Sequence, residues 1–306
     1  MFLKVIVIWT LKSNYVCKIY NSSFLRRYIV SVIRFMLFTF LVFMAVACSY
    51  KIPTHKERLL RAESLTQKRD FQQLRLKSDD FSFFSYAKNL QGCRVAHIYI
   101  EGDGFAWRTS SQISQDPTPL NPLALKLATE DERSCVIYLA RPCQYISSKE
   151  CFQKYWTSHR FSKKVIKNYE QLLDSLKREY GIESFELYGY SGGGAVATLI
   201  AAFRNDVSLL VTIAGNIDTK KWCEIHYLTP LSASLNPAEY IQEVENIPQI
   251  HLIGGDDTNV KKDVFDAYIA KAFNRDKIAY KIYPGFTHSK GWAGSWKSIL
   301  KELKNN

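Results

Sequence analysis

Two hydrophobic patterns alternate along most of the chain. Short runs of β-branched and aromatic residues, typical of buried strands, are separated by longer segments in which apolar residues recur with a helical period. Such alternation predicts an α/β protein with a mostly parallel sheet and helices on both faces. The candidate strands are residues 94–102, 135–142, 184–191, 208–215, 248–255 and 279–285, and the clearest helices are 159–179, 192–204, 260–273 and 292–303. Residues 81–88 (FSFFSYAK) predict a further antiparallel edge strand.

The same pattern divides the chain into a leader, a tether and one domain. We expect residues 1–47 to be a signal or membrane-targeting segment, residues 48–80 a tether with a polar helix, and residues 81–306 the α/β domain. A long insertion of mixed character, at about 216–246, separates two candidate strands. Insertions of this kind often carry function, so we expect a small cap there.

The leader has the layout of a signal peptide. Arg26, Arg27 and Arg34 precede residues 35–48, which are apolar except for Thr39 and end in small residues. The apolar core is shorter than the roughly 20 residues of a spanning helix, although an anchor that begins near residue 29 is an alternative. The stretch before Arg26 is longer than a signal needs. One explanation is an upstream extension that results from a miscalled start codon.

The end of the leader resembles the lipobox of bacterial lipoproteins. Residues 45–48 read AVAC, with alanine where leucine is usual, and the resemblance makes Cys48 the candidate for lipidation. A plain cleaved signal, or a buried thiol in an anchor, are the alternatives. All three predict export to the cell envelope, on the periplasmic side, and we expect a lipid or an anchor as the contact with the membrane.

The basic charge is concentrated in the leader. Lysine and arginine outnumber aspartate and glutamate by 41 to 29, a net charge of +12, but the first 47 residues hold six basic side chains and no acidic one. The rest has an ordinary surface balance, so we expect no nucleic-acid partner. With 47% hydrophobic residues, the composition excludes a disordered chain, a collagen and a small disulfide scaffold.

Five cysteines follow Cys48, at positions 93, 135, 143, 151 and 223. Cys143 and Cys151 flank a short polar loop, which in an oxidising compartment favours a local disulfide, with two free thiols as the alternative. The sequence contains neither a CxxC pair nor an HExxH helix, so we expect no metal site and no cofactor.

One motif carries specific chemistry. Strand SFELYGY runs into Gly189, Tyr190, Ser191, Gly192 and Gly193 and then into an apolar helical segment. This is G-x-S-x-G in the strand–turn–helix context that lifts a serine hydroxyl above a sheet, where only small residues fit at positions 189 and 193. The alternative is a glycine-rich helix start that binds an anion or packs closely. A P-loop is excluded because no Gly-Lys-Ser/Thr follows.

From this motif the chain is identified as resembling the α/β-hydrolase superfamily, from about residue 80 to its end. The superfamily places an acid after a late strand and a histidine after the last one. Here the segment GGDDTNV resembles the pattern around the acid, which points to Asp257, with Asp256 as the neighbouring alternative. His288 follows the last candidate strand. The resemblance implies that Ser191 is the nucleophile, His288 its base and Asp257 the residue that orients the histidine.

The resemblance also implies an oxyanion hole. Its donors would be the Gly192 N–H and an N–H of Asp103 or Gly104, in the segment EGDG after an early strand. Glu101 stands where many hydrolases have histidine. It brings a second carboxylate near a site for negative charge, so we expect these side chains to point away or to pair with a cation.

Arg141 is the candidate for that cation, and a surface salt bridge is its alternative role. Other residues at the carboxyl ends of the strands predict a substrate rim, where ligands of open α/β sheets bind: Trp107, Arg141, Tyr190 and Asn216. The cap piece 222–237 would close over it, with His226 in a structural role. The EGDG, DPTP, RPCQY and AGN segments are similar to those of a group of bacterial α/β-hydrolases, a likeness that supplies no substrate.

These features favour an envelope-associated serine hydrolase that cleaves an ester, thioester or amide of a small acyl substrate through an acyl-enzyme. Carboxylester hydrolysis is the commonest such activity in the superfamily. A peptidase remains open, since an acidic lip at the site would suit a substrate amine. The alternatives from other classes are a non-catalytic lipoprotein that uses the fold as a binding module, and a cofactor-free lyase or acyltransferase.

Overall fold

The computed structural model describes residues 22–46, 51–67 and 69–304. The chain divides into two units, Met1–Ile52 and Pro53–Asn306. In the first unit, helix α1 (Ser22–Val46) contains most of the predicted apolar segment. No helix in the described part of the chain has both the length and the apolar character that crossing a membrane requires. Cys48, the candidate lipidation site, lies outside the described residues.

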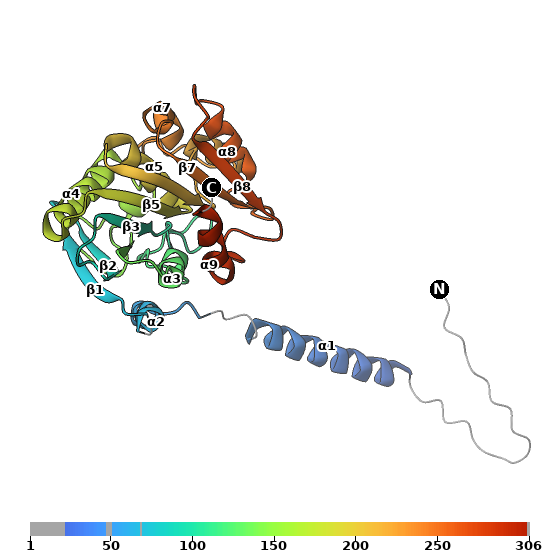
Figure 1. Cartoon of the computed structure of the whole chain (residues 1–306). Coiled ribbons are helices and arrows are strands. Elements are labelled where there is room, and N and C mark those ends of the chain that lie inside the picture. Colours follow the sequence, from blue (N-terminus) through green and yellow to red (C-terminus); the bar gives the residue numbers. More distant parts are fainter. Residues whose placement is uncertain (1–21, 47–50, 68, 305–306) are drawn as a thin grey trace, which may run out of the picture. The chain divides into compact units, whose positions relative to one another are not determined.

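The second unit is built on one sheet, which has eight strands among the described residues (Figure 1). Their order is β1-β2-β4-β3-β5-β6-β7-β8. The pairs β1–β2 and β2–β4 are antiparallel, and all other neighbours are parallel, which confirms the predicted sheet type. The strands are β1 (Gln72–Lys77), β2 (Ser82–Lys88), β3 (Val95–Ile100), β4 (Val136–Leu139), β5 (Ser184–Tyr190), β6 (Val207–Ile213), β7 (Gln249–Gly254) and β8 (Ile278–Tyr283).

Helices cover both faces of this sheet, as the alternating pattern predicts. One face packs against α2 (His55–Thr66), α3 (Leu123–Glu130) and α9 (Trp292–Leu303), which lie together in Figure 1. The other face packs against α4 (Lys163–Tyr180), α5 (Gly192–Phe203), α7 (Ile241–Val244) and α8 (Lys262–Ile269). The central strands are therefore buried on both sides, and their carboxyl ends form the edge at which the site lies.

Helix α4 shows how the local sequence sets an element. Its apolar residues recur every three or four positions, so that Val165, Tyr169, Leu172 and Leu176 form one buried stripe. The Ser162 hydroxyl accepts the Val165 N–H at the start of the helix. The helix ends at Gly181, whose φ of 71° is the left-handed conformation that glycine adopts without a steric penalty.

The structure differs from the prediction in residues 53–80, which belong to the domain rather than to a tether. Helix α2 buries Ala62 against the sheet, and β1 forms the edge strand beside β2. FSFFSYAK is antiparallel, as predicted, but it lies inside the sheet. Strand β1 has only two partly buried apolar residues, Leu74 and Leu76, because an edge strand needs little hydrophobic surface. Its polar composition therefore resembles that of a tether.

The predicted cap at about 216–246 consists of two parts with different roles. Helix α6 (Thr219–Ile225) follows β6 at the edge of the sheet where the site lies. The later part, η2 (Pro237–Tyr240) and α7, buries Ala238, Ile241 and Val244 against α5 and α8. Only the first part is placed as a cap would be, and the second belongs to the helical cover of the sheet.

Two disulfides stabilise the domain. The bond between Cys143 and Cys151 is present, which is one of the two possibilities that the sequence leaves open. A second bond joins Cys93 and Cys135, which precede the neighbouring parallel strands β3 and β4. Cys223 is the free cysteine among those that the structure describes, and it is buried.

Candidate active site

The turn between β5 and α5 holds Ser191 in a strained conformation. Its φ of 52° and ψ of −119° lie outside the regions that residues with a side chain normally occupy. A Cβ atom at Gly193 would overlap the Ile100 carbonyl oxygen, and one at Gly189 would overlap the Gly193 carbonyl oxygen. This confirms the prediction that only very small residues fit at positions 189 and 193. The backbone thus presents the serine hydroxyl above the sheet.

Two side chains from later strand ends form a hydrogen-bonded chain with Ser191. His288 Nε2 lies 3.0 Å from the Ser191 hydroxyl oxygen, and His288 Nδ1 lies 2.9 Å from an oxygen of Asp257. The other Asp257 oxygen accepts the N–H groups of Asn259 and Val260, at 2.8 and 2.9 Å. The Asp257 side chain is fully buried. An aspartate held in this way fixes the histidine with Nδ1 protonated and Nε2 free to accept the serine proton.

The neighbouring aspartate is placed differently. Asp256 is exposed and extends its side chain to no hydrogen-bond partner in the described part of the chain, while its N–H donates to the Phe286 carbonyl. The two candidates for the acid, which the sequence leaves as alternatives, are thus distinguished by geometry. Asp257 is the residue that contacts His288.

The segment EGDG lies directly against the turn between β5 and α5. A Cβ atom at Gly102 would touch the Tyr190 ring and Ser191 Cβ, at 3.1 and 3.3 Å. Gly104 has a φ of 66° and lies against the Pro117 carbonyl. Within the described residues, neither the Gly192 N–H nor the Asp103 N–H donates to a protein acceptor. Of the predicted oxyanion-hole donors, Gly192 directly follows Ser191 and Asp103 lies against Gly192, whereas Gly104 lies against Pro117.

Glu101 points away from this turn and towards the start of α3. Its carboxylate accepts the Gly102 N–H at 3.0 Å, the Ala124 N–H at 3.4 Å and the Tyr138 hydroxyl at 3.2 Å. Burial is the largest influence on this group and raises its pKa to about 7, although these donors oppose the shift. Glu101 therefore connects the EGDG segment to α3.

Asp103 pairs with two arginines. Arg141 Nη1 and Arg160 Nη1 each lie 3.0 Å from one of its two oxygens. Both guanidinium groups are buried. The pairing with Arg141 that the sequence suggests is present, but it is a buried contact rather than a surface salt bridge. Both carboxylates of EGDG are thus bound to protein groups. They do not form the acidic lip that would suit a substrate amine.

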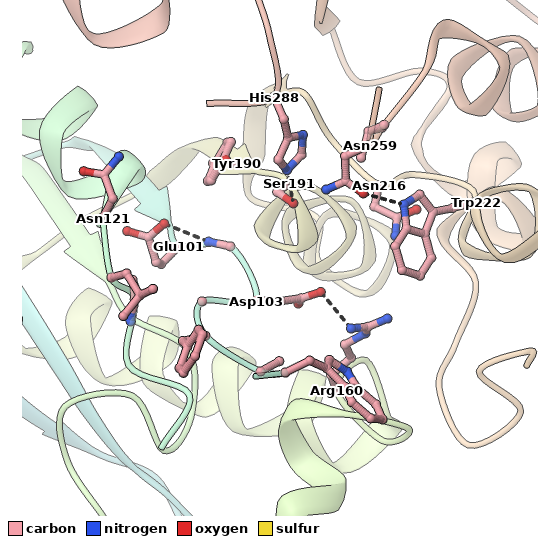
Figure 2. Close-up of a pocket in the computed structure, with 18 residues that line it drawn as sticks. Glu101, Asp103, Asn121, Arg160, Tyr190, Ser191, Asn216, Trp222, Asn259 and His288 are labelled. Carbon is pink, nitrogen blue, oxygen red and sulfur yellow. Dashed lines mark hydrogen bonds and ion pairs between the residues drawn. The ribbon is translucent and has the colours of Figure 1, made fainter. Parts of the chain in front are cut away.

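These elements enclose a cavity of about 390 Å³ beside Ser191 (Figure 2). Trp107, Tyr190 and Asn216, three of the four predicted rim residues, line it. Arg141 does not, because its side chain lies beneath Asp103. Asn121 also lines the cavity, in the loop segment 116–122 that is expected at this rim, and so does Arg160, which was not predicted there. Arg160 lies in the turn before α4, and only its pairing with Asp103 in space distinguishes it from a surface residue.

Helix α6 joins the cavity to the loop that carries the acid. Trp222 lines the cavity and donates its indole N–H to the Asn259 side chain at 3.2 Å. His226 contacts the Asn259 carbonyl through Nε2, at 2.6 Å. His226 thus lies outside the cavity lining, in a contact between α6 and the acid loop, which fits the structural role expected for it. Asn259 holds the first part of the cap in place.

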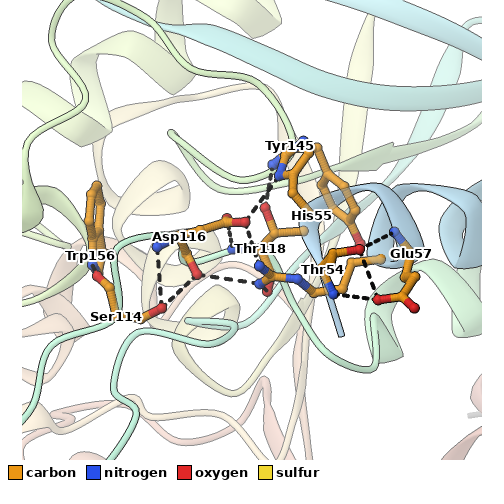
Figure 3. A network of polar contacts seen from close by, with 9 residues as sticks. Thr54, His55, Glu57, Ser114, Asp116, Thr118, Tyr145 and Trp156 are labelled. Atoms are coloured by element: carbon orange, nitrogen blue, oxygen red, sulfur yellow. Dashed lines mark hydrogen bonds and ion pairs between the residues drawn. The ribbon is translucent and has the colours of Figure 1, made fainter. Parts of the chain in front are cut away.

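The N-terminal arm, which we define as residues 53–77, supports another wall of the cavity. Figure 3 shows Asp116 and Thr118 between Ser114 and the residues at the start of α2. Arg58 pairs with Asp116 and donates to the Thr118 carbonyl at 2.6 Å. Burial raises the pKa of Asp116, but Thr118, His55 and the Arg58 charge outweigh it and hold the pKa below its usual value. This loop continues into residues 119–121, which line the cavity.

The described residues contain no group of three or more histidine, cysteine, aspartate or glutamate side chains that could hold a metal ion. The polar groups at the cavity include the hydrogen-bonded chain of Ser191, the N–H groups beside it, and the Asp103–Arg160 pair. The chemistry that this set can perform is nucleophilic attack by an activated serine.

Solved structures of other proteins have the same architecture. An esterase of Pyrococcus furiosus aligns with a TM-score of 0.56 at 14% identity, over 79% of this chain and 94% of that chain. Est1E from Butyrivibrio proteoclasticus gives 0.53 at 12% identity, over 76% and 99%. The α/β hydrolase GrgF from Penicillium gives 0.55 at 11% identity, over 77% and 96%. No model of a known protein family and no curated protein sequence matches the chain. The chain has the α/β-hydrolase fold.

Proposed function

We propose that this protein is a serine hydrolase that cleaves an ester, thioester or amide through an acyl-enzyme. The observation that carries the proposal is the hydrogen-bonded chain Ser191–His288–Asp257, at a turn whose backbone is strained so as to present the serine. A free serine hydroxyl is a poor nucleophile, and a histidine held in this tautomer supplies the base that it lacks.

In the proposed mechanism, Ser191 Oγ attacks the carbonyl carbon of the substrate while His288 Nε2 takes the serine proton. The N–H groups of Gly192 and Asp103 stabilise the oxyanion of the tetrahedral intermediate. His288 then donates its proton to the leaving group as the acyl bond breaks. A water molecule, deprotonated by His288, attacks the acyl-enzyme and releases the acid and the free serine. Asp257 keeps the imidazole oriented and stabilises its charged form.

A carboxylester is the substrate class that we favour. Two of the structural neighbours are an esterase and Est1E, and Est1E has also been solved with ferulic acid bound. These likenesses support the fold rather than a substrate, so an amide remains the second candidate. A lyase or an acyltransferase would use the same serine and would differ in how the acyl-enzyme is resolved.

Labelling with a fluorophosphonate tests the proposal. We expect the full chain to be labelled covalently at Ser191, as mapped by peptide mass analysis, and the Ser191→Ala variant to remain unlabelled. Ser298→Ala, which removes an exposed serine of α9, is the matched control and should label like the wild type. A folded wild-type protein that does not react would contradict the proposal and favour the binding-module alternative.

We also propose that the leader delivers the domain to the cell envelope, with Cys48 as the lipidation site. Two disulfides support an exported protein, because such bonds are rare in a reducing cytosol. Metabolic labelling with a radioactive fatty acid should mark the wild type and the Cys17→Ser control but not Cys48→Ser. Label that remains on Cys48→Ser would exclude this cysteine as the site.

A further inference from the structure

The end of the cavity at Asp103 carries more positive than negative charge. Two buried guanidinium groups, of Arg141 and Arg160, share the single Asp103 carboxylate. The other two carboxylates of the site are engaged elsewhere, Glu101 with α3 and Asp257 with His288. A buried cation without a full counter-charge is costly, and the cost falls when an anion enters beside it.

Arg160 is the arginine that reaches the cavity. Its side chain is 7% exposed, and its guanidinium lies over the rings of Trp222 and Phe161, each centroid 5.4 Å away, which fixes its plane. Nη1 contacts Asp103. Within the described residues, Nε is buried without a partner and Nη2 also contacts no acceptor. Arg160 therefore has unused donors beside the cavity.

A second unpaired polar group faces the same end. Asn216 is 3% exposed and lines the cavity, and its side-chain oxygen is buried without a partner. Its backbone N–H donates to the Ser191 carbonyl at 3.0 Å, so the residue has a fixed position beside the nucleophile. Figure 2 shows Arg160, Asn216 and Trp222 on one side of Ser191, with Glu101 and Asn121 on the other.

This end of the cavity lies close to the reacting serine. The Asp103 carboxylate packs against Gly192, where a Cβ atom would overlap it, and Gly192 directly follows Ser191. A group held by Arg160 is therefore only a few bonds from the carbonyl under attack. A guanidinium and an amide that can turn its N–H₂ towards the ligand suit a planar carboxylate.

We propose that Arg160 and Asn216 form a subsite for a carboxylate, so that the preferred substrates are acyl compounds with a carboxylate a few bonds from the scissile carbonyl. This inference rests on the proposed hydrolase function and adds the class of substrate. The carboxylate can belong to the acyl part, as in a dicarboxylic monoester, or to the leaving group.

Matched ester pairs test the subsite with the full chain. Monoethyl succinate is compared with ethyl succinamate, and acetoxyacetate with acetoxyacetamide, so that each pair exchanges a carboxylate for a neutral amide of the same shape. We expect kcat/KM to favour the carboxylate in one pair by about 10- to 100-fold, the range of a hydrogen bond to a charged group. Arg160→Gln should reduce that ratio to near one.

Arg94→Gln is the matched control, because it removes an exposed arginine paired with Glu183 at the opposite end of the sheet. It should leave the ratio unchanged. Because Arg160 also holds Asp103, activity on both esters is expected to fall in Arg160→Gln, and the ratio is the decisive quantity. A ratio near one in the wild type for both pairs, or a preference that survives Arg160→Gln, would overturn the subsite.

The rate of fluorophosphonate labelling gives a second readout that requires no turnover. Free succinate should slow the labelling of Ser191 in the wild type, whereas succinamide should not, and Arg160→Gln should lose the difference. Labelling without any succinate effect would reject the subsite and leave the hydrolase standing. Absence of labelling would reject the hydrolase itself, so the two failures are distinct.

Discussion

The two sides of the cavity are constructed on different physical principles. The serine corner, which consists of Ser191, His288 and Asp257, is placed by backbone geometry at the ends of β5, β8 and β7. The loop wall, residues 101–122, is held by buried polar and charged side chains that belong to other parts of the chain. Asp103 is held by Arg141 and Arg160, and Asp116 is held by Arg58 of the N-terminal arm.

This difference determines what a change at each side should do. In the serine corner, the side chains themselves take part in the proposed reaction, and the backbone remains in place without them. In the loop wall, a side chain that is removed leaves a buried partner without its counter-charge, so the wall itself is expected to move. The first side should respond in kcat with little loss of stability, and the second should respond in stability and KM.

The largest effect is expected when a reacting group of the serine corner is removed. Ser191→Ala and His288→Ala should each lower kcat by about 10⁶-fold, since the two groups act as a unit. The free energy of unfolding should change by less than about 1 kcal/mol, because neither side chain is needed for the turn. Steady-state kinetics and urea unfolding measure the two quantities. A variant that unfolds would show that the corner is also structural.

A smaller loss in kcat is expected at the acid. Asp257→Asn should lower it by about 10⁴-fold, because an amide at this place disfavours the useful tautomer of His288 without removing the base. Asp256→Asn is the matched control at the neighbouring exposed position and should retain full activity. If Asp256→Asn were inactive and Asp257→Asn active, the acid would have to be reassigned by one residue.

The turn of the serine corner could be predicted because its requirements are local, since the glycines at 189 and 193 are dictated by steric overlap within that turn. Asp257 and His288 were predicted from the resemblance to the α/β-hydrolase superfamily, which places an acid and a histidine after late strands, and Asp256 stayed an alternative to Asp257. Five of the six parallel strands were predicted from their apolar runs, since they lie inside the sheet. The sixth, β8, is a mostly exposed edge strand and was predicted from its β-branched and aromatic residues. The residues themselves therefore predicted the sheet and the serine turn, and the family resemblance added the acid and the histidine.

The contact between Asp103 and Arg141 was predicted, because both residues follow neighbouring strands. The rest of the loop wall could not be predicted, because no motif links its partners in the sequence. Helix α3 has only eight residues and no capping side chain before it, and the carboxylate of Glu101 accepts the N–H groups at its start. Arg160 lies within the predicted helix 159–179, and its sequence context gives no sign that it pairs with Asp103. The N-terminal arm reads as a tether because β1 is a polar edge strand.

The loop wall should also respond to pH through Glu101. Burial raises its pKa from an ordinary value to about 7, so between pH 4.5 and 7 the folded state keeps a proton that the unfolded state has lost. The contribution of this group to stability is therefore greatest below about pH 4.5 and is lost as the pH rises to about 7. The decrease due to this group is about 2–3 kcal/mol between pH 5 and 8.

Glu101→Gln removes the titrating group and should retain an acceptor for the Gly102 and Ala124 N–H groups. The free energy of unfolding, measured in urea at pH 5 and 8, should therefore rise by about 2–3 kcal/mol in the variant relative to the wild type as the pH rises. Glu183→Gln, at an exposed carboxylate, is the control and should show no such gain. Parallel pH profiles of wild type and Glu101→Gln would contradict the shift.

The smallest effect is expected in the N-terminal arm, where it tests how far the loop wall extends. In Arg58→Ala, Asp116 keeps its contacts with Thr118 and His55 and is partly exposed to water. The free energy of unfolding should therefore fall by about 2 kcal/mol, which is less than the full cost of breaking a buried ion pair. KM should rise with little change in kcat, because residues 119–121 of this loop line the cavity. Arg69→Ala, which removes a more exposed arginine of the same arm, should cost less than about 1 kcal/mol and leave KM unchanged. Equal effects of the two substitutions would mean that the arm contributes only to general stability and does not position the loop wall.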